Sequence, residues 1–168
     1  VILKISTLST FVLMSINSIA APRFAQLHAK ENHTGLEQYV SQIAKVIFFS
    51  SIPIFFFIII FRSWLLGLFG TEFIVGSDAL MVVMIGQFFN VFAGSVGAIL
   101  NMTGRQVVFR NILIISTLVN IIACFIFIPS MGIMGSAIAG MIFMACWNLI
   151  SMFYIKYKFK LKTYFWPF

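Results

Sequence analysis

Charged residues are scarce in this 168-residue sequence. Only 9% of the residues are charged and 61% are hydrophobic, whereas soluble domains carry roughly 25% charged residues. The mean hydropathy is correspondingly high, at +1.07. A soluble domain of this length has too small an interior to bury so much apolar side-chain surface, which excludes a soluble fold. The composition therefore predicts an integral membrane protein.

Residues with catalytic or metal-binding chemistry are also few. The four acidic residues all lie away from the centres of the apolar stretches: Glu31, Glu37, Glu72 and Asp78. Cys124 and Cys146 are predicted to be small packing residues, because they offer neither a disulfide framework nor CxxC spacing. His28 and His33 are spaced in a way that suits a metal-binding helix poorly. Without a carboxylate pair, a Ser/His/Asp arrangement or a glycine-rich phosphate loop, the sequence predicts no enzyme, no metal site and no cofactor.

The apolar residues are gathered into five long runs, at 1–21, 43–61, 79–101, 112–128 and 133–154. Each run is close to the roughly 20 residues that a helix needs to cross a bilayer. The sequence therefore predicts an all-α, polytopic membrane protein with five spans and a cytoplasmic tail at 155–168. Because the first residue is Val1 and no charged leader precedes the first run, we expect a carboxyl-terminal part of a longer protein.

Lysine and arginine fall almost entirely in one alternate set of the gaps between these runs. The basic residues of this set are Arg23, Lys30, Arg105, Arg110, Lys156, Lys158, Lys160 and Lys162, with Lys45 at the edge of the second run. The other gaps hold Arg62 alone, together with Glu72 and Asp78. Since lysine and arginine near span ends are retained in the cytoplasm, the amino end is predicted outside and the carboxyl end inside. This rule accounts for the net charge of +7 without a nucleic-acid partner.

The carboxyl-terminal segment KYKFKLKTYFWPF combines lysines with Tyr157, Tyr164 and Trp166. Tyrosine and tryptophan favour the headgroup region of a bilayer, and each lysine near anionic lipid contributes about 1 kcal/mol. We therefore expect this tail to lie along the inner membrane surface, with membrane lipids as its partner.

The third apolar run carries a regular set of polar and small residues. Gln87, Asn90, Gly94, Gly97 and Asn101 alternate at spacings of three and four, which predicts that all five share one face of a helix. Polar residues in a membrane helix face protein or water. Two interpretations are open: the stripe is the wall of a substrate pathway, or it is a tight helix seam joined by amide hydrogen bonds.

Weaker patterns occur in the other runs. In the fourth run the polar residues Ser116, Asn120 and Cys124 are four apart. The fifth run opens with residues small enough for close backbone approach: Gly132, Gly135, Ser136, Ala139 and Gly140. Close helix packing is the favoured interpretation there. Pro53 is predicted to bend the second run, because proline removes a hydrogen-bond donor.

Lys4 is the one charged residue that can sit within a predicted span, because Lys45 lies at the edge of the second run. On a helix it shares a face with Ser15 and Ser18 but not with Asn17. If this face lines a cavity, Lys4 is a candidate partner for an anionic headgroup such as a pyrophosphate. If the span begins at Val1, the ammonium group can instead snorkel to the outer interface.

The segments between the runs resemble those of one transporter family. The segment SIAAPRFAQLHAKENHTGLEQYV, in which Pro22 ends a span, resembles a cytoplasmic loop of polysaccharide and oligosaccharidyl-lipid flippases. LLGLFGTEFIVG resembles their next outer connector, LNMTGRQVVFRN their short basic turn, and IPSMGIMGSAIAG their proline- and glycine-marked hairpin. Their order, spacing and sidedness match over essentially the whole chain.

This resemblance implies the multidrug/oligosaccharidyl-lipid/polysaccharide exporter superfamily, whose members have two pseudo-symmetric helix bundles around a central cavity. By this resemblance the chain forms most of the carboxyl-terminal bundle, and the amino-terminal bundle is a missing partner. The implied function is to move an undecaprenyl-pyrophosphate-linked oligosaccharide across the bacterial cytoplasmic (inner) membrane for surface polysaccharide such as O-antigen or capsule.

The resemblance assigns no conserved motif to individual positions, so the candidate site residues are selected by their chemistry. Cationic and amide groups lower the barrier for an anionic, sugar-bearing headgroup, and the candidates for the pathway are Lys4, Gln87, Asn90, Asn101 and Asn120. Arg23 and Arg105 are candidates for attracting pyrophosphate from the cytoplasm, although the positive-inside rule also explains both. The rival functions are a multidrug or cation antiporter, which the lack of a membrane-embedded carboxylate disfavours, and a truncated membrane protein without transport.

Overall fold

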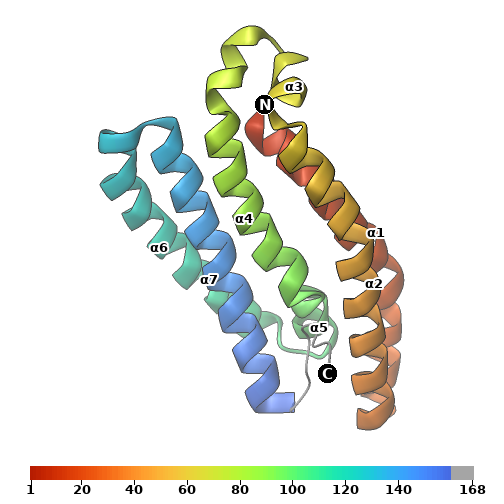
Figure 1. The fold of residues 1–168 in the computed structure, drawn as a ribbon. Helices are drawn as coiled ribbons and strands as arrows, with labels where there is room; N and C mark the ends of the chain where they lie inside the picture. The colour runs from red at the N-terminus through yellow and green to blue at the C-terminus, as the bar shows by residue number, and fades with distance from the viewer. Residues whose placement is uncertain (160–168) are drawn as a thin grey trace.

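The structure, a computed structural model, describes residues 1–159, and all the regular elements in that part of the chain are helices (Figure 1). In chain order they are α1 (Ile2–Ala29), α2 (His33–Ile60), α3 (Arg62–Gly67), the 3-10 helix η1 (Thr71–Gly76), α4 (Ser77–Ala93), α5 (Val96–Met102), α6 (Gln106–Met131) and α7 (Ile133–Phe159). The residues after 159 in the predicted tail lie outside the described part.

Five helical segments in the described part are long and apolar enough to cross a membrane, which confirms the predicted fold class. They are Ile2–Ala29, His33–Ile60, Thr71–Ala93, Gln106–Met131 and Ile133–Phe159. The first two contain 28 residues each, or roughly 42 Å of helix, whereas the hydrocarbon core is about 30 Å thick. α1 and α2 are therefore long enough to extend beyond it.

The helix that carries the first span extends past Pro22, and the predicted end of that span at Pro22 remains a prediction. α1 continues through Pro22 to Ala29. The ring lies on the exposed side of the helix, while Phe24 and Leu27 in the following turn are buried. This amphipathic packing keeps the chain helical despite the missing N–H of proline. α2 also continues through Pro53, and the predicted bend there remains a prediction.

The third predicted span is wrong as a single helix over 79–101. α4 ends at Ala93, and Gly94 has φ 70° and ψ −135°, a conformation that a helix cannot contain and that glycine adopts at little cost. Its N–H closes the last turn on the carbonyl oxygen of Val91 at 3.1 Å. α5 then starts at Val96 as a separate short helix. The apolar segment instead begins earlier, at Thr71.

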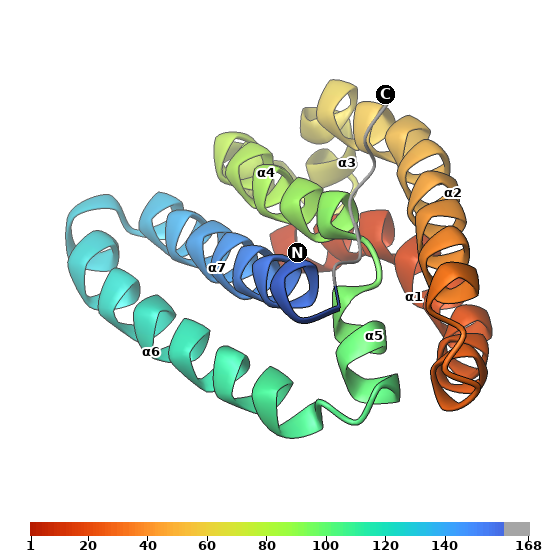
Figure 2. The same cartoon turned by 90° about the horizontal axis from the view of Figure 1, so that it is seen from below.

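α4 is the central helix of the described bundle. It packs against α1 and α2 on one side and against α7 on the other, and α6 packs chiefly on α7 (Figure 2). The central span is also the most buried one: 44% of the most apolar window of Thr71–Ala93 is buried, against 17% for Gln106–Met131. The core therefore sits around α4, and α6 lies at the edge of the bundle.

Glycines permit two close helix approaches. A methyl group added at Gly135 of α7 would collide with the backbone of α6 at Phe127 and Ile128, and one at Gly86 of α4 would lie 3.0 Å from Cα of Met141 in α7. Gly140 differs from the prediction, because a methyl group there meets no heavy atom within 4 Å. The small residues of the fifth run thus contribute unequally to packing.

This difference gives a matched pair of substitutions. Gly135→Ala in the full-length protein is expected to lower Tm, because the α6–α7 hairpin must open to admit the methyl group at a cost of about 1–3 kcal/mol. Gly140→Ala is expected to leave Tm unchanged or raise it, since alanine is the better helix former by roughly 1 kcal/mol. Thermal unfolding in detergent measures both, and equal effects would contradict the observed packing.

Candidate functional site

Three amide side chains meet between α4 and α7. Asn90 Nδ2 donates to Gln87 Oε1 at 3.4 Å within α4. Asn148 Nδ2 from α7 donates to Asn90 Oδ1 at 3.4 Å and to the carbonyl oxygen of Met144 at 2.8 Å. Gln87 and Asn148 are 2% and 0% exposed. These residues, called the amide cluster below, join two spans by side-chain hydrogen bonds inside the bundle.

The amide cluster has unused hydrogen-bonding capacity. Asn148 Oδ1 is buried and has no hydrogen-bond partner among the described residues, and the same holds for Oγ of Ser151 one turn further along α7. Leaving such a group unpaired in an apolar interior costs about 1–3 kcal/mol. The α4–α7 interface therefore retains a buried hydrogen-bond acceptor that its own side chains do not satisfy.

Asn148 is absent from the candidates identified in the sequence. The signal was nevertheless present: Met141, Met144, Asn148 and Ser151 follow one another at spacings of three and four, the same rule that identified Gln87 and Asn90. The small residues at the start of the fifth run favour close helix packing, and this signal is stronger in the sequence than that of the polar face.

The remaining pathway candidates do not join the amide cluster. The break at Gly94 places Asn101 on α5, so the predicted five-residue stripe on one helix is wrong. Asn120 lies half-buried on α6 and accepts a hydrogen bond from Cys124 Sγ at 3.7 Å. Lys4 is exposed in the first turn of α1. The candidates thus lie on four different helices, and Gln87 and Asn90 alone are hydrogen bonded to each other.

Lys4 lies on a mixed, outward face of α1. Ser15 and Ser18, predicted to share this face, are exposed, and their hydroxyl groups donate to the α1 carbonyl oxygens of Phe11 and Ser15 at 2.9 and 2.7 Å. Leu8, Phe11 and Met14 are also more than half exposed. Both serine hydroxyl groups are hydrogen bonded within α1. Lys4 is therefore the residue on this face that needs a polar partner from outside the helix.

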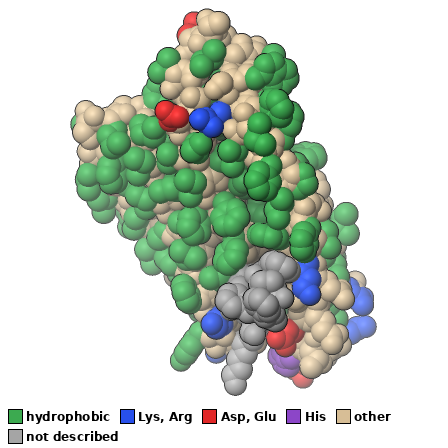
Figure 3. Space-filling model, in the orientation of Figure 1, with side chains coloured by type: hydrophobic (Ala, Val, Ile, Leu, Met, Phe, Trp, Pro, Cys, Tyr) green, Lys and Arg blue, Asp and Glu red, His purple; other side chains and the backbone are tan. Residues whose placement is uncertain are grey.

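Basic side chains gather at the end of the bundle where α1 ends and α2 begins (Figure 3). Arg23 is exposed there and donates to Gln26 Oε1 at 3.3 Å. Arg105 is half-buried at the start of α6, beside the end of α5. In the described part of the chain, no group of three or more histidine, cysteine or acidic residues is arranged to hold a metal ion.

A double-mutant cycle tests the bond across the α4–α7 interface. Asn90→Ala and Asn148→Ala in the full-length protein should show a coupling of about 0.6 kcal/mol in the free energy of unfolding, a typical value for hydrogen bonds between membrane helices. Asn90→Ala combined with Asn120→Ala should be additive within roughly 0.3–0.5 kcal/mol, because Asn120 has a different partner. SDS unfolding titrations give these energies, and additivity of the first pair would refute the bond.

Comparisons with known proteins agree with this architecture. The MatE family matches residues 1–126. The chain is 27% identical over 140 residues to the "Probable low-salt glycan biosynthesis flippase Agl15" of Haloferax volcanii, a match that covers 81% of this chain and 29% of that protein. The chain therefore spans less than a third of that relative's length, and no solved structure gave a significant match.

Both matches indicate a membrane transporter, and they confirm the resemblance inferred from the four connecting segments. The family match covers the four spans from α1 to most of α6. The chain belongs to the MatE family, within the multidrug/oligosaccharidyl-lipid/polysaccharide exporter superfamily.

Proposed function

We propose that the full-length protein moves a lipid-linked oligosaccharide with an anionic headgroup from the cytoplasmic to the outer leaflet. This chain supplies most of its carboxyl-terminal bundle, and the amino-terminal bundle completes the pathway. The observation that carries this proposal is membership in the MatE family together with a relative named as a glycan biosynthesis flippase. The proposed carrier is undecaprenyl pyrophosphate, and the proposed setting is the bacterial cytoplasmic membrane during synthesis of O-antigen or capsule.

The distribution of charge supports an anionic substrate over a cationic drug. The acidic residues lie near helix ends or in connecting segments: Glu31 in the α1–α2 turn, Glu37 near the start of α2, Glu72 in η1 and Asp78 at the start of α4. A cation carried through the bilayer needs a buried countercharge. This bundle offers basic and amide groups instead, which suit a pyrophosphate and the hydroxyl groups of sugars.

Each candidate has a role in the proposed mechanism. Arg23 and Arg105 attract the pyrophosphate on the cytoplasmic side. Gln87 and Asn90, held by Asn148, supply amide groups for hydrogen bonds with sugar hydroxyl groups, while Asn101 and Asn120 contribute further amides. Lys4 receives the headgroup near the outer end. Alternating access between the two bundles exposes these groups to each side in turn.

Glycan translocation can be measured by leaflet. In a strain without the parent gene, a membrane-impermeant sugar-oxidising reagent on intact and opened vesicles should find the lipid-linked intermediate on the cytoplasmic face. Lys4→Ala and Gln87→Ala should restore translocation at least about tenfold less well than the wild type, the equivalent of ~1.4 kcal/mol lost at the barrier. Lys4→Arg is the matched control, because it keeps the charge and should restore translocation.

Three other outcomes count against the proposal. Full restoration of translocation by both alanine variants would show that neither residue belongs to the pathway. An unchanged glycan together with altered sensitivity to cationic drugs would favour an antiporter. No phenotype in either assay would favour a truncated protein without transport.

The proposed orientation has its own test. In the full-length protein with Cys124 and Cys146 replaced by alanine, Thr71→Cys should react with an impermeant maleimide on intact cells, because η1 faces outward in this topology. Thr34→Cys, at the start of α2, should react only after the membrane is opened. Both positions are exposed in the structure. Labelling of Thr34→Cys in intact cells would show that the topology is the reverse of the proposed one.

A further inference from the structure

The segment that contains α3 and η1 joins two spans and is itself mostly apolar. Its sequence is RSWLLGLFGTEFIVG, in which Arg62 and Glu72 are the charged residues. α2 ends at Ile60, just before α3, and α4 begins at Ser77, directly after η1. No linker on either side is long enough to carry this segment away from the membrane surface.

The segment is folded onto the end of the bundle. Gly70, with φ 133° and ψ 144°, turns the chain between α3 and η1. A methyl group added at Gly67 of α3 would lie 3.7 Å from Cδ1 of Ile74 in η1. Leu66 is fully buried, in the same core cluster as Leu80 of α4. α3 and η1 therefore form one packed unit, called the α3–η1 unit below.

The outward side of the α3–η1 unit carries large apolar side chains. The exposed ones are Trp64, Leu68, Phe69, Phe73, Ile74 and Val75. Connecting segments that run through water have polar surfaces, whereas a contiguous apolar patch marks a contact with protein or membrane. Thr71 and Glu72 are also exposed, directly after the turn at Gly70. The unit thus combines an apolar side with a short polar tip.

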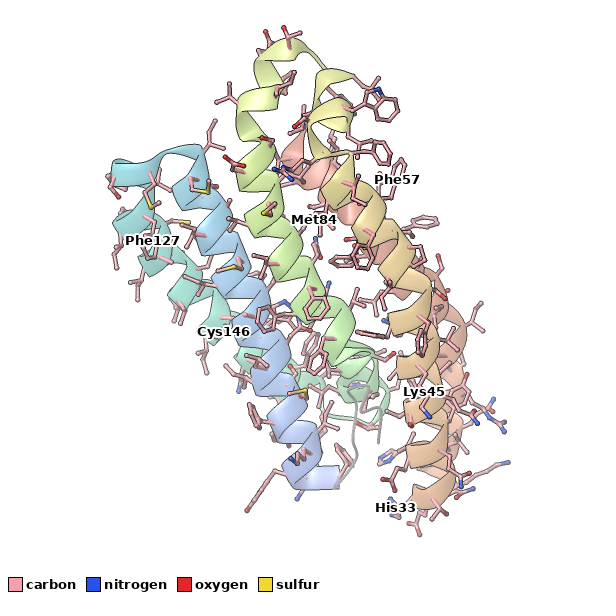
Figure 4. The ribbon with its side chains drawn as sticks, viewed as in Figure 1. His33, Lys45, Phe57, Met84, Phe127 and Cys146 are labelled. Atoms are coloured by element: carbon pink, nitrogen blue, oxygen red, sulfur yellow. The ribbon has the colours of Figure 1, made fainter. Side chains whose placement is uncertain are left out.

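A ladder of aromatic rings connects the α3–η1 unit to the exposed face of α2. The ring centroids of Phe57 and Phe61 are 5.0 Å apart, and those of Phe61 and Trp64 are 6.3 Å apart. The three side chains are 48%, 46% and 58% exposed. Phe57 points away from the bundle on a span (Figure 4). The ladder therefore continues the outer surface of a span directly onto α3.

The length of α2 places the start of α3 near the boundary of the hydrocarbon core. α2 has no charged residue after Lys45, and Phe61 follows Lys45 by 16 residues, or roughly 24 Å of helix. The hydrocarbon core is about 30 Å thick. With the Lys45 ammonium group at one boundary, Phe61 does not pass the other one. α3 therefore starts no further out than the lipid headgroups.

We propose that the α3–η1 unit lies in the lipid interface and inserts its apolar side into the boundary between headgroups and acyl chains. Trp64 suits this level, because its ring is apolar while its N–H needs a polar partner. Arg62, half-buried at the start of α3, lies at the level of the lipid phosphates, whose charge it complements. The polar tip at Thr71 and Glu72 faces water. The partner of this surface is the bilayer, not another protein.

Fluorescence quenching tests this placement. The full-length protein keeps Trp64 as its sole tryptophan, with the others replaced by phenylalanine, and is reconstituted in phosphatidylcholine vesicles. Lipid brominated near the headgroup should quench Trp64 about twofold more than lipid brominated near the chain ends, because interfacial side chains lie roughly 5–10 Å deep. Iodide in the water should quench Trp64 less than the shallow bromines do.

Three results would overturn the inference. Quenching of Trp64 chiefly by iodide would mean that the unit stands in water, where it is free for a protein partner. Quenching by neither reagent would mean that the rest of the protein covers it. Equal or stronger quenching by the deep bromines would place Trp64 in the hydrocarbon core instead of the interface.

Two substitutions identify the inserted side. In the protein without other tryptophans, Val75→Trp should be quenched chiefly by the shallow bromines, whereas Thr71→Trp, the matched control at the polar tip, should be quenched chiefly by iodide. Val75 is 86% exposed and Thr71 is also exposed, so neither indole displaces a packed neighbour. The same quenching profile at both positions would overturn the proposed insertion.

A buried tryptophan provides the reference for these measurements. Trp147 packs on Phe109 with ring centroids 5.9 Å apart, so a protein that retains Trp147 alone should be quenched less than one that retains Trp64. Quenching of Trp147 as strong as that of Trp64 would overturn the assignment of Trp64 to the lipid interface. The inference is independent of transport, and bromines in both leaflets give the same result whichever side of the membrane α3 faces.

Discussion

Backbone hydrogen bonding in hydrocarbon is the constraint on which this structure depends. Every N–H and C=O inside a bilayer needs a partner from the protein, so each span is a helix and irregular backbone survives only where other helices bury it. The break between α4 and α5 follows this rule: Ala93 and Ser95 are nearly fully buried, and Gly94 closes the α4 turn through its own N–H. The break thus occurs where the surrounding helices shield it.

The same constraint explains how polar side chains are distributed. Serines and threonines of α1 donate to carbonyl oxygens of their own helix, so they remain compatible with either lipid or protein neighbours. Amides have more groups to satisfy than one helix can provide, and Gln87, Asn90 and Asn148 therefore meet between two helices. Hydroxyl groups therefore indicate little about which faces are in contact, whereas these three amides mark the interface between α4 and α7.

The sequence was sufficient for the properties that depend on composition and period. Hydropathy predicted five spans, and the four connecting segments predicted the family, because both signals are local. The break at Gly94 was missed, because the hydropathy of an apolar run is the same whether or not one glycine in it adopts a positive φ. Asn148 was missed although its spacing with Met144 and Ser151 marks a polar face of the fifth run. Its partner Asn90 depends on how α7 packs on α4, which a single sequence does not give.

The edge position of α6 has a consequence for how this chain can change through evolution. Little of α6 is buried within the described bundle, and it packs chiefly on α7, so contacts inside this bundle require little of its outer side chains beyond being apolar. Any apolar residue of ordinary helix propensity satisfies that requirement. α4 is held to a much narrower set of side chains by neighbours on both flanks. Relatives of this protein should therefore diverge fastest along α6 and retain residue size and polarity along α4.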